Sequence, residues 1–394
     1  MNVVPRRIWV RALETAVACL LCAAFAGGQA KPVAPKAPAQ KPPQMAENVL
    51  KNVQVLKGIP LDEFMGTMGF FAAALSLNCT DCHVAESLGN WDKYAEDTPL
   101  KETARKMILM VRALNKTNFA GQPMVTCYTC HRSSAHPKVK PSLSEQYGVV
   151  PDIDPDDVES VGQASTSPGA LSADQILDKY IAAVGGAERL ATLSSFLAKG
   201  TYGGFDTADH KVPVEVYAKA PDLRATVAHV PIGDGTTKDS ITTYDGRAGW
   251  IFAPNTLVPM LELTGGNLDG AKVDAELSFP GQIKQALVKW RADYPETTID
   301  GHPVRIVSGV EGKSLVKLYF DKESGLLVRQ LRDARTAVGP NPTQVDYSDY
   351  RDVAGIKLPF HWELSWTDGQ STFELSDVQP NVPVDAAKFA KPTP

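Results

Sequence analysis

Hydrophobic and polar positions follow two different periods along this chain. Between residues 46 and 147, apolar side chains recur every three or four positions, which is the spacing of one helix face. Beyond residue 171, one capped helix at Ser172–Gly186 precedes short runs of alternating apolar residues, rich in β-branched and aromatic types. The pattern therefore predicts a mostly α half followed by an antiparallel β half.

Two long helices are predicted in the first half. The first takes Asp62 as its cap and stops near Asn78, and the second covers roughly Pro99 to Asn115. Each lies just upstream of a C-x-x-C-H sequence. We interpret this as an internal repeat of helix, turn and motif.

The second half predicts a meander of short strands. Turn signals at Asp245-Gly246, Ser324-Gly325 and Asp368-Gly369 favour tight hairpins between them. A short helical pattern from Gln282 to Trp290 is expected to cover one opening of a curved sheet or open barrel. The strand signals are Val214 to Tyr217, Ser240 to Tyr244, Ala248 to Phe252, Val304 to Val307, Val316 to Phe320, Leu326 to Leu331, Lys357 to Trp366 and Ser371 to Leu375.

Composition extends this division to the whole chain. With 394 residues and 43% hydrophobic content, two domains with linkers are expected. The net charge of −5 gives no basic field for nucleic acid, so no nucleic-acid partner is expected. The predicted parts are a signal peptide (1–30), a Pro-rich tether (31–45), a mostly α domain with both C-x-x-C-H motifs (46–147), an acidic linker (148–170) and an antiparallel β domain (171–394).

The N-terminus has the pattern of an export signal. Arg6, Arg7 and Arg11 precede an apolar stretch from Thr15 to Ala26, and small residues place cleavage after Ala30. Export predicts a periplasmic location. A retained anchor, or a lipid on Cys19 or Cys22, is the alternative that would associate the chain with a membrane.

The four cysteines outside the predicted signal all belong to two C-x-x-C-H motifs. Such a motif supplies two thiols for the vinyl groups of one porphyrin and an imidazole for its iron. The motifs predict that residues 46–147 are a dihaem cytochrome c domain. It would carry two covalently bound haem c groups, with His83 and His131 as axial ligands of the irons. The thiols that would bind the haems are those of Cys79 and Cys82 in the first motif and Cys127 and Cys130 in the second.

Two other chemistries use C-x-x-C pairs. A zinc site could combine both pairs, but it leaves both histidines unused. A redox-active dithiol needs one pair, and does not explain two copies with histidine appended.

Methionines on the two predicted helices are candidates for the sixth iron position. They form two pairs at i, i+3 spacing, and each pair lies upstream of one motif. Packing in the core is the alternative role. One methionine of Met65 and Met68, and one of Met107 and Met110, is expected to bind iron.

The other polar residues around the two motifs give weaker evidence for haem binding. His136, after the second motif, is more readily explained as an exposed loop residue than as a distal ligand. The helical half is locally basic, which suits either a solvated helix face or pairing with haem propionates. The basic residues concerned are Lys101, Arg105, Lys106, Arg112, Lys116 and Arg132.

Residues 47 to 148 resemble the cytochrome c subunit of photosynthetic reaction centres. The resemblance rests on Gly58-Ile-Pro60, Met68, Asn78 to His83, Met107, Met110 to Arg112, Asn115 and Val125 to Arg132. That family is a tetrahaem electron donor in which a helix bearing the axial ligand, mostly methionine, precedes each motif. The resemblance implies electron transfer with redox protein partners, and favours Met68 over Met65 and Met107 over Met110. It covers two haems rather than four, and Lys116 to Val125 lacks the histidine that the family uses as one distal ligand.

The β half resembles the open-barrel lipoprotein-carrier proteins of the bacterial periplasm. The resemblance is one of pattern, in Tyr244 to Trp250, Leu318 to Gly325 and Asp346 to Tyr350. It implies a curved sheet around a helix and a hydrophobic ligand, such as a lipid, in the concave face. A docking module without a ligand is the alternative.

The function expected from the sequence is single-electron transfer, because irons with two axial ligands leave no open site for a substrate. Two alternatives stay open. One is a dihaem peroxidase or oxidase in which one haem keeps a vacant position. The other is a carrier of hydrophobic ligands whose haems sense redox state.

Overall fold

The computed structural model describes residues 42–137, 139–140, 171–204, 207–232, 236–254 and 256–393, except the side chains of 294–296. The predicted signal peptide, most of the tether and the acidic linker lie outside the described residues. The described residues from Pro43 onward belong to one compact unit. Within the described part of the chain, no helix is both long and apolar enough to cross a membrane.

The N-terminal part of this unit is helical, as predicted. Its two long helices are α2 (Leu61–Leu75) and α4 (Pro99–Asn118). Thr98 caps α4, and its side chain accepts from the Lys101 N–H. Short helices carry the two motifs. The remaining elements are α1 (Ala46–Val49), α3 (Cys79–Cys82), the 3₁₀ turns η1 (Ala85–Leu88) and η2 (Trp91–Ala95), and α5 (Cys127–His131).

The predicted role of Asp62 as the cap of α2 is wrong. Pro60 occupies the cap position, and no side chain caps the helix there. Asp62 is only 2% exposed, and its carboxylate accepts hydrogen bonds from the N–H and the hydroxyl of Thr264, both at 2.7 Å. It accepts a third from Asn267 Nδ2 at 3.0 Å. A carboxylate near the start of a helix resembles a cap in the sequence, but the Asp62 carboxylate instead accepts hydrogen bonds from Thr264 and Asn267, which lie about 200 positions later in the chain.

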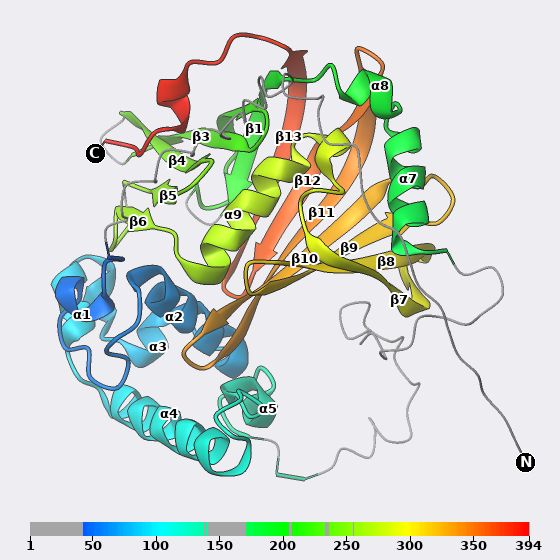
Figure 1. Cartoon of the computed structure of the whole chain (residues 1–394). Coiled ribbons are helices and arrows are strands. Elements are labelled where there is room, and N and C mark those ends of the chain that lie inside the picture. The colour runs from blue at the N-terminus through cyan, green and yellow to red at the C-terminus, as the bar shows by residue number, and fades with distance from the viewer. Residues whose placement is uncertain are drawn as a thin grey trace, which may run out of the picture. The chain divides into compact units, whose positions relative to one another are not determined.

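The C-terminal part is an antiparallel curved sheet, as predicted (Figure 1). Its order is β6-β5-β4-β3-β2-β1-β13-β12-β11-β10-β9-β8-β7, so β1 pairs with β13 and every other neighbour is consecutive in the chain. The strands are β1 (Ser195–Gly204), β2 (Val212–Lys219), β3 (Leu223–Pro231), β4 (Thr237–Asp245), β5 (Gly249–Phe252), β6 (Met260–Glu262), β7 (Val288–Ile299), β8 (His302–Glu311), β9 (Ser314–Asp321), β10 (Leu327–Thr336), β11 (Gly339–Val353), β12 (Ile356–Trp366) and β13 (Gly369–Pro380).

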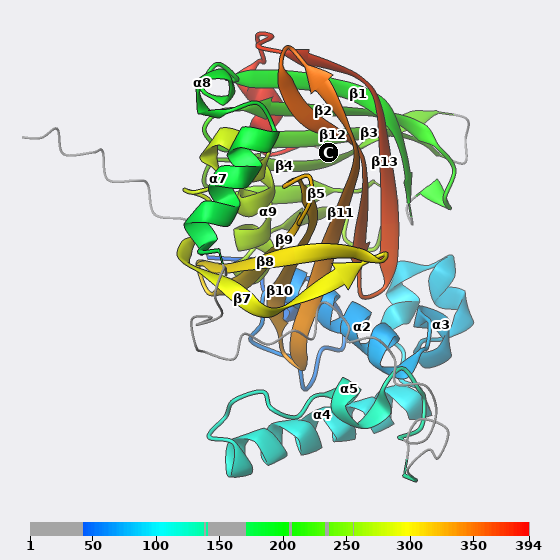
Figure 2. The same cartoon turned by 90° about the vertical axis from the view of Figure 1, so that its right-hand side faces the viewer.

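Helices lie within the curve of the sheet, where they bury its inner side chains (Figure 2). Leu177 of α7 (Ala173–Ala183) and Val273 of α9 (Gly265–Leu277) are fully buried in one cluster with residues of both sheet halves. The helix cap predicted at Ser172 forms, as a capping box with Gln175. The short elements α8 (Ala187–Leu190), η5 (Pro280–Gln282) and η6 (Ala386–Phe389) complete the described structure.

The predicted helix from Gln282 to Trp290 is wrong, since β7 begins within it at Val288. The helix under the sheet is α9, and its glycines hid it from the pattern because glycine is a poor helix former. These glycines have a packing role. A Cβ on Gly266 would lie 2.7 Å from the Ala334 Cα, and one on Gly270 would lie 2.2 Å from Arg332 Nε, so only glycine lets α9 approach β10 this closely.

One hairpin of the sheet packs into the helical part. The turn between β10 and β11 places Val338, 5% exposed, in a cluster with Phe70 of α2 and Ile108 of α4. Gly339 has a positive φ and its position is bounded by Phe70, where a Cβ would come within 2.8 Å of the ring. The helical part therefore completes its core with a residue from the sheet.

Glu276, near the end of α9, is a carboxylate that is largely shielded from solvent. Burial raises its pKa from 4.5 to about 7, and Lys272, which opposes this, lies 3.7 Å away. Lys272 pairs more closely with Glu311, at 2.7 Å, so Glu276 is left with the weaker interaction. Its Oε2 is buried and has no hydrogen-bond partner among the described residues.

We predict that Glu276 makes stability depend on pH. The folded chain binds this proton more tightly than the unfolded chain, so the contribution is present below pH 4.5 and is lost as pH rises through about 7. Relative to Glu276→Gln, the wild-type free energy of unfolding should fall between pH 5 and pH 8. Urea denaturation at both values measures it. Glu188→Gln, on the exposed surface of α8, is the control, and an equal pH response in all three proteins would contradict the assignment.

Candidate haem sites

The two motif helices begin in the same way. In α3 the Asn78 side chain accepts from the N–H groups of Thr80 and Asp81, and Asp81 Oδ2 accepts from the Asn78 N–H. In α5 the residues Thr126 and Thr129 form the same reciprocal box. Each box fixes the backbone at the first cysteine, because that cysteine is the first residue of the helix. Both motifs are therefore presented on a capped helical turn.

The two histidines are also held alike. Nδ1 of His83 lies 3.1 Å from the Tyr94 carbonyl oxygen, and Nδ1 of His131 lies 3.0 Å from that of Ser134. A carbonyl can only accept, so Nδ1 carries the proton and Nε2 keeps its lone pair. A histidine that binds a metal through one nitrogen commonly donates the other N–H to such a partner.

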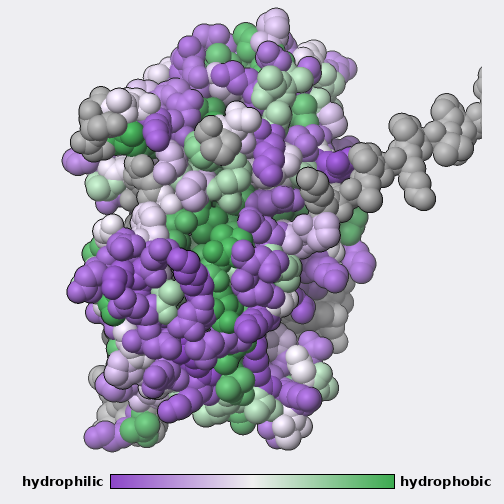
Figure 3. All heavy atoms as spheres, turned by 90° about the vertical axis from the view of Figure 1, so that its left-hand side faces the viewer, coloured by the Kyte–Doolittle hydropathy of each residue, from purple (hydrophilic) through white to green (hydrophobic). Residues whose placement is uncertain are grey.

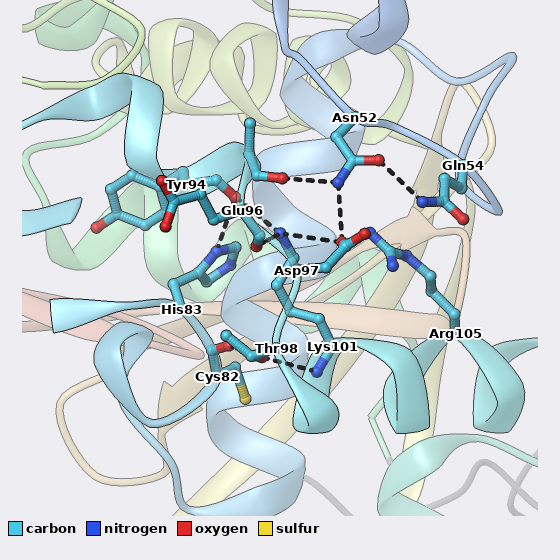
Figure 4. Close-up of polar contacts among 11 residues, drawn as sticks. Asn52, Gln54, Cys82, His83, Tyr94, Glu96, Asp97, Thr98, Lys101 and Arg105 are labelled. Atoms are coloured by element: carbon cyan, nitrogen blue, oxygen red, sulfur yellow. Dashed lines mark hydrogen bonds and ion pairs between the residues drawn. The ribbon is translucent and has the colours of Figure 1, made fainter. Parts of the chain in front are cut away.

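A polar network supports the first histidine (Figure 4). Lys101 donates to the carbonyls of Tyr94 and Glu96, at 2.9 and 2.6 Å. Burial and, secondly, the nearby Lys101 charge lower the pKa of His83. The neutral imidazole, which is the form that binds metals, is thus favoured.

Asp97 holds the outer part of this network together. Its Oδ1 accepts from Arg105 Nη2 at 2.6 Å and from Asn52 Nδ2 at 2.8 Å, and Asn52 also donates to the Ala95 carbonyl. The hydrogen bond from Arg105 lowers the pKa of Asp97. Lys101 and Arg105, which the sequence marked as possible partners of haem propionates, are thus bound to protein groups here.

Helix α4 connects the two motifs. At its start, Thr98 Oγ1 donates to the Cys82 carbonyl at 2.6 Å. Near its end, the 9% exposed Asn115 donates to the Val125 carbonyl at 2.7 Å and accepts from the Val125 N–H at 2.9 Å. The predicted ligands Met107 and Met110 lie between these two anchor points.

The four candidate methionines differ in their surroundings. Met65 and Met68 on α2 are half-buried, and Met68 packs on the cluster that contains Phe70. Met107 and Met110 on α4 are 37% and 45% exposed. On α4 the buried residues are Ile108, Val111 and Asn115, so Met107 and Met110 occupy an adjacent apolar stripe that the protein leaves uncovered. That one methionine of each pair binds iron, and which one it is, stay predictions.

Exposed apolar side chains are concentrated in this part of the chain. All but two of the large hydrophobic residues that the described structure exposes fall between Val49 and Val139. Figure 3 shows one face of the molecule, on which hydrophobic surface forms a band between hydrophilic areas. A porphyrin is a broad apolar ring that would cover such side chains. The residues are Val49, Leu88, Trp91, Leu100, Met107, Leu109, Met110, Leu114, Phe119, Met124, Tyr128 and Val139. Together with the free thiols and the oriented imidazoles, they fit haem.

The other chemistries of C-x-x-C pairs find less support. Burial raises the pKa of Cys127 to about 11 and also raises that of Cys82, whereas redox-active pairs contain a thiol of lowered pKa. Among the described residues, no group of three or more His, Cys, Asp or Glu side chains could hold a metal ion. The two cysteine pairs are therefore not gathered into one zinc site. His136 is exposed after the second motif.

Comparison with known proteins supports the resemblance of this half. Residues 11–152 match the family model described as photosynthetic reaction centre cytochrome C subunit. The haem-motif half resembles that family. The subunit of Thermochromatium tepidum is 41% identical over 98 residues, which are 24% of this chain and 23% of that protein. The subunit of Rubrivivax gelatinosus is 33% identical over 97 residues, 21% of this chain and 26% of that protein. This chain therefore spans about a quarter of these relatives.

Solved structures similar to this chain each match just over half of its length. A LolA superfamily protein from Nitrosomonas europaea is 15% identical with a TM-score of 0.36, and the match covers 56% of this chain and 99% of that one. A DUF1329 family protein from Desulfovibrio piger is 12% identical with a TM-score of 0.38, over 55% of this chain and 97% of that one.

The residues that orient the two histidines and the motif helices were not predicted from the sequence. Asn78 and Asp81 form a capping-box pattern around the first motif that could have been found, since the box spacing is regular. The carbonyls of Tyr94 and Ser134 could not, because any residue supplies a carbonyl and only the fold decides which one faces the imidazole.

We predict that Asn115→Ala weakens the second motif selectively. It leaves the N–H and carbonyl of Val125 without their partner, which typically costs about 1 to 3 kcal/mol. Urea denaturation of the haem-loaded protein, followed at the haem absorption band, should show the loss. Asn118→Ala, which removes one exposed bond to the Leu114 carbonyl, is the control. Equal effects of both variants would argue against this role of Asn115.

Proposed function

We propose that this chain is an exported dihaem c-type cytochrome that passes single electrons between redox protein partners. The observation that carries the proposal is the repeated geometry of the two motifs. Each has a capped turn, free cysteines and a histidine whose Nδ1 faces a carbonyl. One such motif would be a local coincidence of sequence, whereas two with the same supports indicate the same ligand twice.

Each motif residue has a distinct role in this proposal. Cys79 and Cys82, and Cys127 and Cys130, would hold one haem c each through thioether bonds, which makes the attachment independent of redox state. His83 and His131 would bind the irons through Nε2, and their carbonyl partners keep the rings from rotating. A bound haem supplies a site for one electron.

The methionines set the class of reaction. Met68 on α2 and Met107 on α4 are the proposed sixth ligands, with Met65 and Met110 as alternatives. A thioether stabilises ferrous iron and fills the position that a substrate would need. Two haem irons with both axial positions occupied favour electron transfer over a reaction of a substrate bound to the iron. The family resemblance of residues 11–152 supports a cytochrome with redox partners, and the periplasm is the proposed compartment.

The test uses the full chain produced with haem attachment. We expect a mass increase of two haems and low-spin optical and EPR spectra for both. Met68→Leu and Met107→Leu should each convert one haem to a high-spin form, because leucine matches the volume but cannot bind iron. Met65→Leu and Met110→Leu are the matched controls and should stay low-spin.

Two other results would redirect the assignment. High-spin spectra in the controls instead would transfer the ligand role to Met65 or Met110. A high-spin haem in the unaltered protein would contradict the electron-carrier proposal and favour the peroxidase or oxidase alternative, which requires an open iron.

A further inference from the structure

The carbonyl that orients His83 is shared with a cation (Figure 4). Nδ1 of His83 lies 3.1 Å from the Tyr94 carbonyl oxygen, and Lys101 Nζ donates to the same oxygen at 2.9 Å. The Lys101 ammonium also donates to the Glu96 carbonyl at 2.6 Å. One backbone oxygen therefore joins the imidazole proposed to bind iron to a positive charge.

The charge of Lys101 is shielded from solvent and only partly balanced. Its side chain is 14% exposed, and the carboxylate oxygen that pairs with it, Asp97 Oδ1, lies 4.0 Å away. That oxygen also accepts from Arg105 Nη2 at 2.6 Å, and the Arg105 side chain is 15% exposed. Burial lowers the pKa of Lys101 in spite of the charge of Asp97. Two cations thus share one carboxylate oxygen beside His83.

The position of Lys101 in α4 is unfavourable for a lysine. It is the third residue of the helix, in the first turn, where the helix dipole favours acidic side chains and opposes cations. The cap of this helix, Thr98, accepts from the Lys101 N–H at 3.2 Å and donates to the Cys82 carbonyl at 2.6 Å. The start of α4 therefore fixes the lysine and the first motif relative to each other.

The second histidine differs from the first in this respect. Nδ1 of His131 lies 3.0 Å from the Ser134 carbonyl oxygen, and among the described residues no cation donates to that oxygen. Arg132 is the adjacent cation, but it is exposed to solvent, which screens its charge. The two motifs thus share their capping boxes and their carbonyl partners, and differ in the buried charge beside one of them.

A cation on this carbonyl affects a haem in one direction. Two donors on one carbonyl oxygen both draw on its electron density, so Lys101 weakens the hydrogen bond that His83 donates. A weaker bond makes the imidazole a less basic ligand of the iron. The shielded charge of Lys101 also opposes the extra positive charge of ferric iron. Both effects favour ferrous iron and raise the reduction potential.

We propose that Lys101 is a positioning residue that acts through the Tyr94 carbonyl to raise the reduction potential of the haem at His83 above that of the haem at His131. The proposal rests on the proposed dihaem function and gives it a direction. Electrons move spontaneously toward the higher potential, so an electron that enters at the His131 haem passes to the His83 haem. The acceptor protein then takes the electron from the His83 haem.

Potentiometric titration of the full haem-loaded chain, followed by optical spectra, tests this order. The unaltered protein should show two one-electron steps. Lys101→Gln should lower the equilibrium constant of the step at higher potential at least tenfold, which is about 59 mV, and leave the other step in place. Lys101→Arg keeps the cation and should keep both potentials. Lys106→Gln removes an exposed lysine of α4 and is the matched control that should move neither step.

Proton NMR of the reduced protein tests the path through Tyr94. Low-spin ferrous haem is diamagnetic, so the Nδ1–H protons of both axial histidines are observable. One of the two signals should move downfield in Lys101→Gln, because the hydrogen bond to the Tyr94 carbonyl strengthens, while the other stays in place. Unchanged signals in this variant would refute the path through the carbonyl.

A structural role of Lys101 predicts a different result. The two carbonyls that it binds lie at the end of η2, so the lysine could serve only to hold that turn. Lys101→Gln would then unfold at lower urea concentration with unchanged potentials. That result, or a fall of the lower step instead of the higher one, would overturn the proposal and leave the dihaem function. A chain without two low-spin haems would refute the proposed function itself.

Discussion

Among the described residues, the helical part of this protein buries only a small cluster of apolar side chains, and one member of that cluster comes from a hairpin of the sheet. Its cluster contains Leu56, Phe70, Ala74, Ile108 and Cys127, and it is completed by Val338 from the sheet. Many of its other large apolar residues stay exposed. Burial of apolar surface is the main favourable term in folding, so such a segment depends on surfaces supplied from outside it. The β10–β11 hairpin supplies one, and the proposed haems would supply others.

Because few apolar side chains are buried in the helical part, hydrogen bonds position the two C-x-x-C-H motifs. The motif helices are single turns, too short to be stable alone. Capping boxes at Asn78 and Thr126, and the bonds that α4 makes at Thr98 and Asn115, fix them instead. The histidines are oriented by carbonyls of the adjoining chain. Hydrogen bonds therefore hold the motif helices and the histidines in position, a role that the packing of an apolar core has in other proteins.

Structural features that depend on a local sequence pattern were predicted correctly. The two long helices, the hairpins at Gly246 and Gly325, the capping box at Ser172 and the antiparallel sheet all follow from periodicity and turn chemistry. Prediction failed where distant contacts override a local signal. Asp62 looks like a cap but is bonded to Thr264, and α9 looks unlike a helix because Gly266 and Gly270 lie against β10. Conversely, the apolar pattern before Trp290 belongs to a turn and a strand.

The position of Val338 has a consequence for the order in which the protein matures. Synthesis proceeds from the N-terminus, so both C-x-x-C-H motifs exist before the hairpin that carries this residue. During that interval the cluster around Phe70 and Ile108 lacks one of its members, and the turn at Gly339 does not yet lie against Thr126. The Cys127 thiol, which the finished fold buries, then lies in an unfinished and more open segment. Completion of the sheet adds Val338 to the cluster that buries this thiol, whereas Cys79 and Cys130 stay exposed.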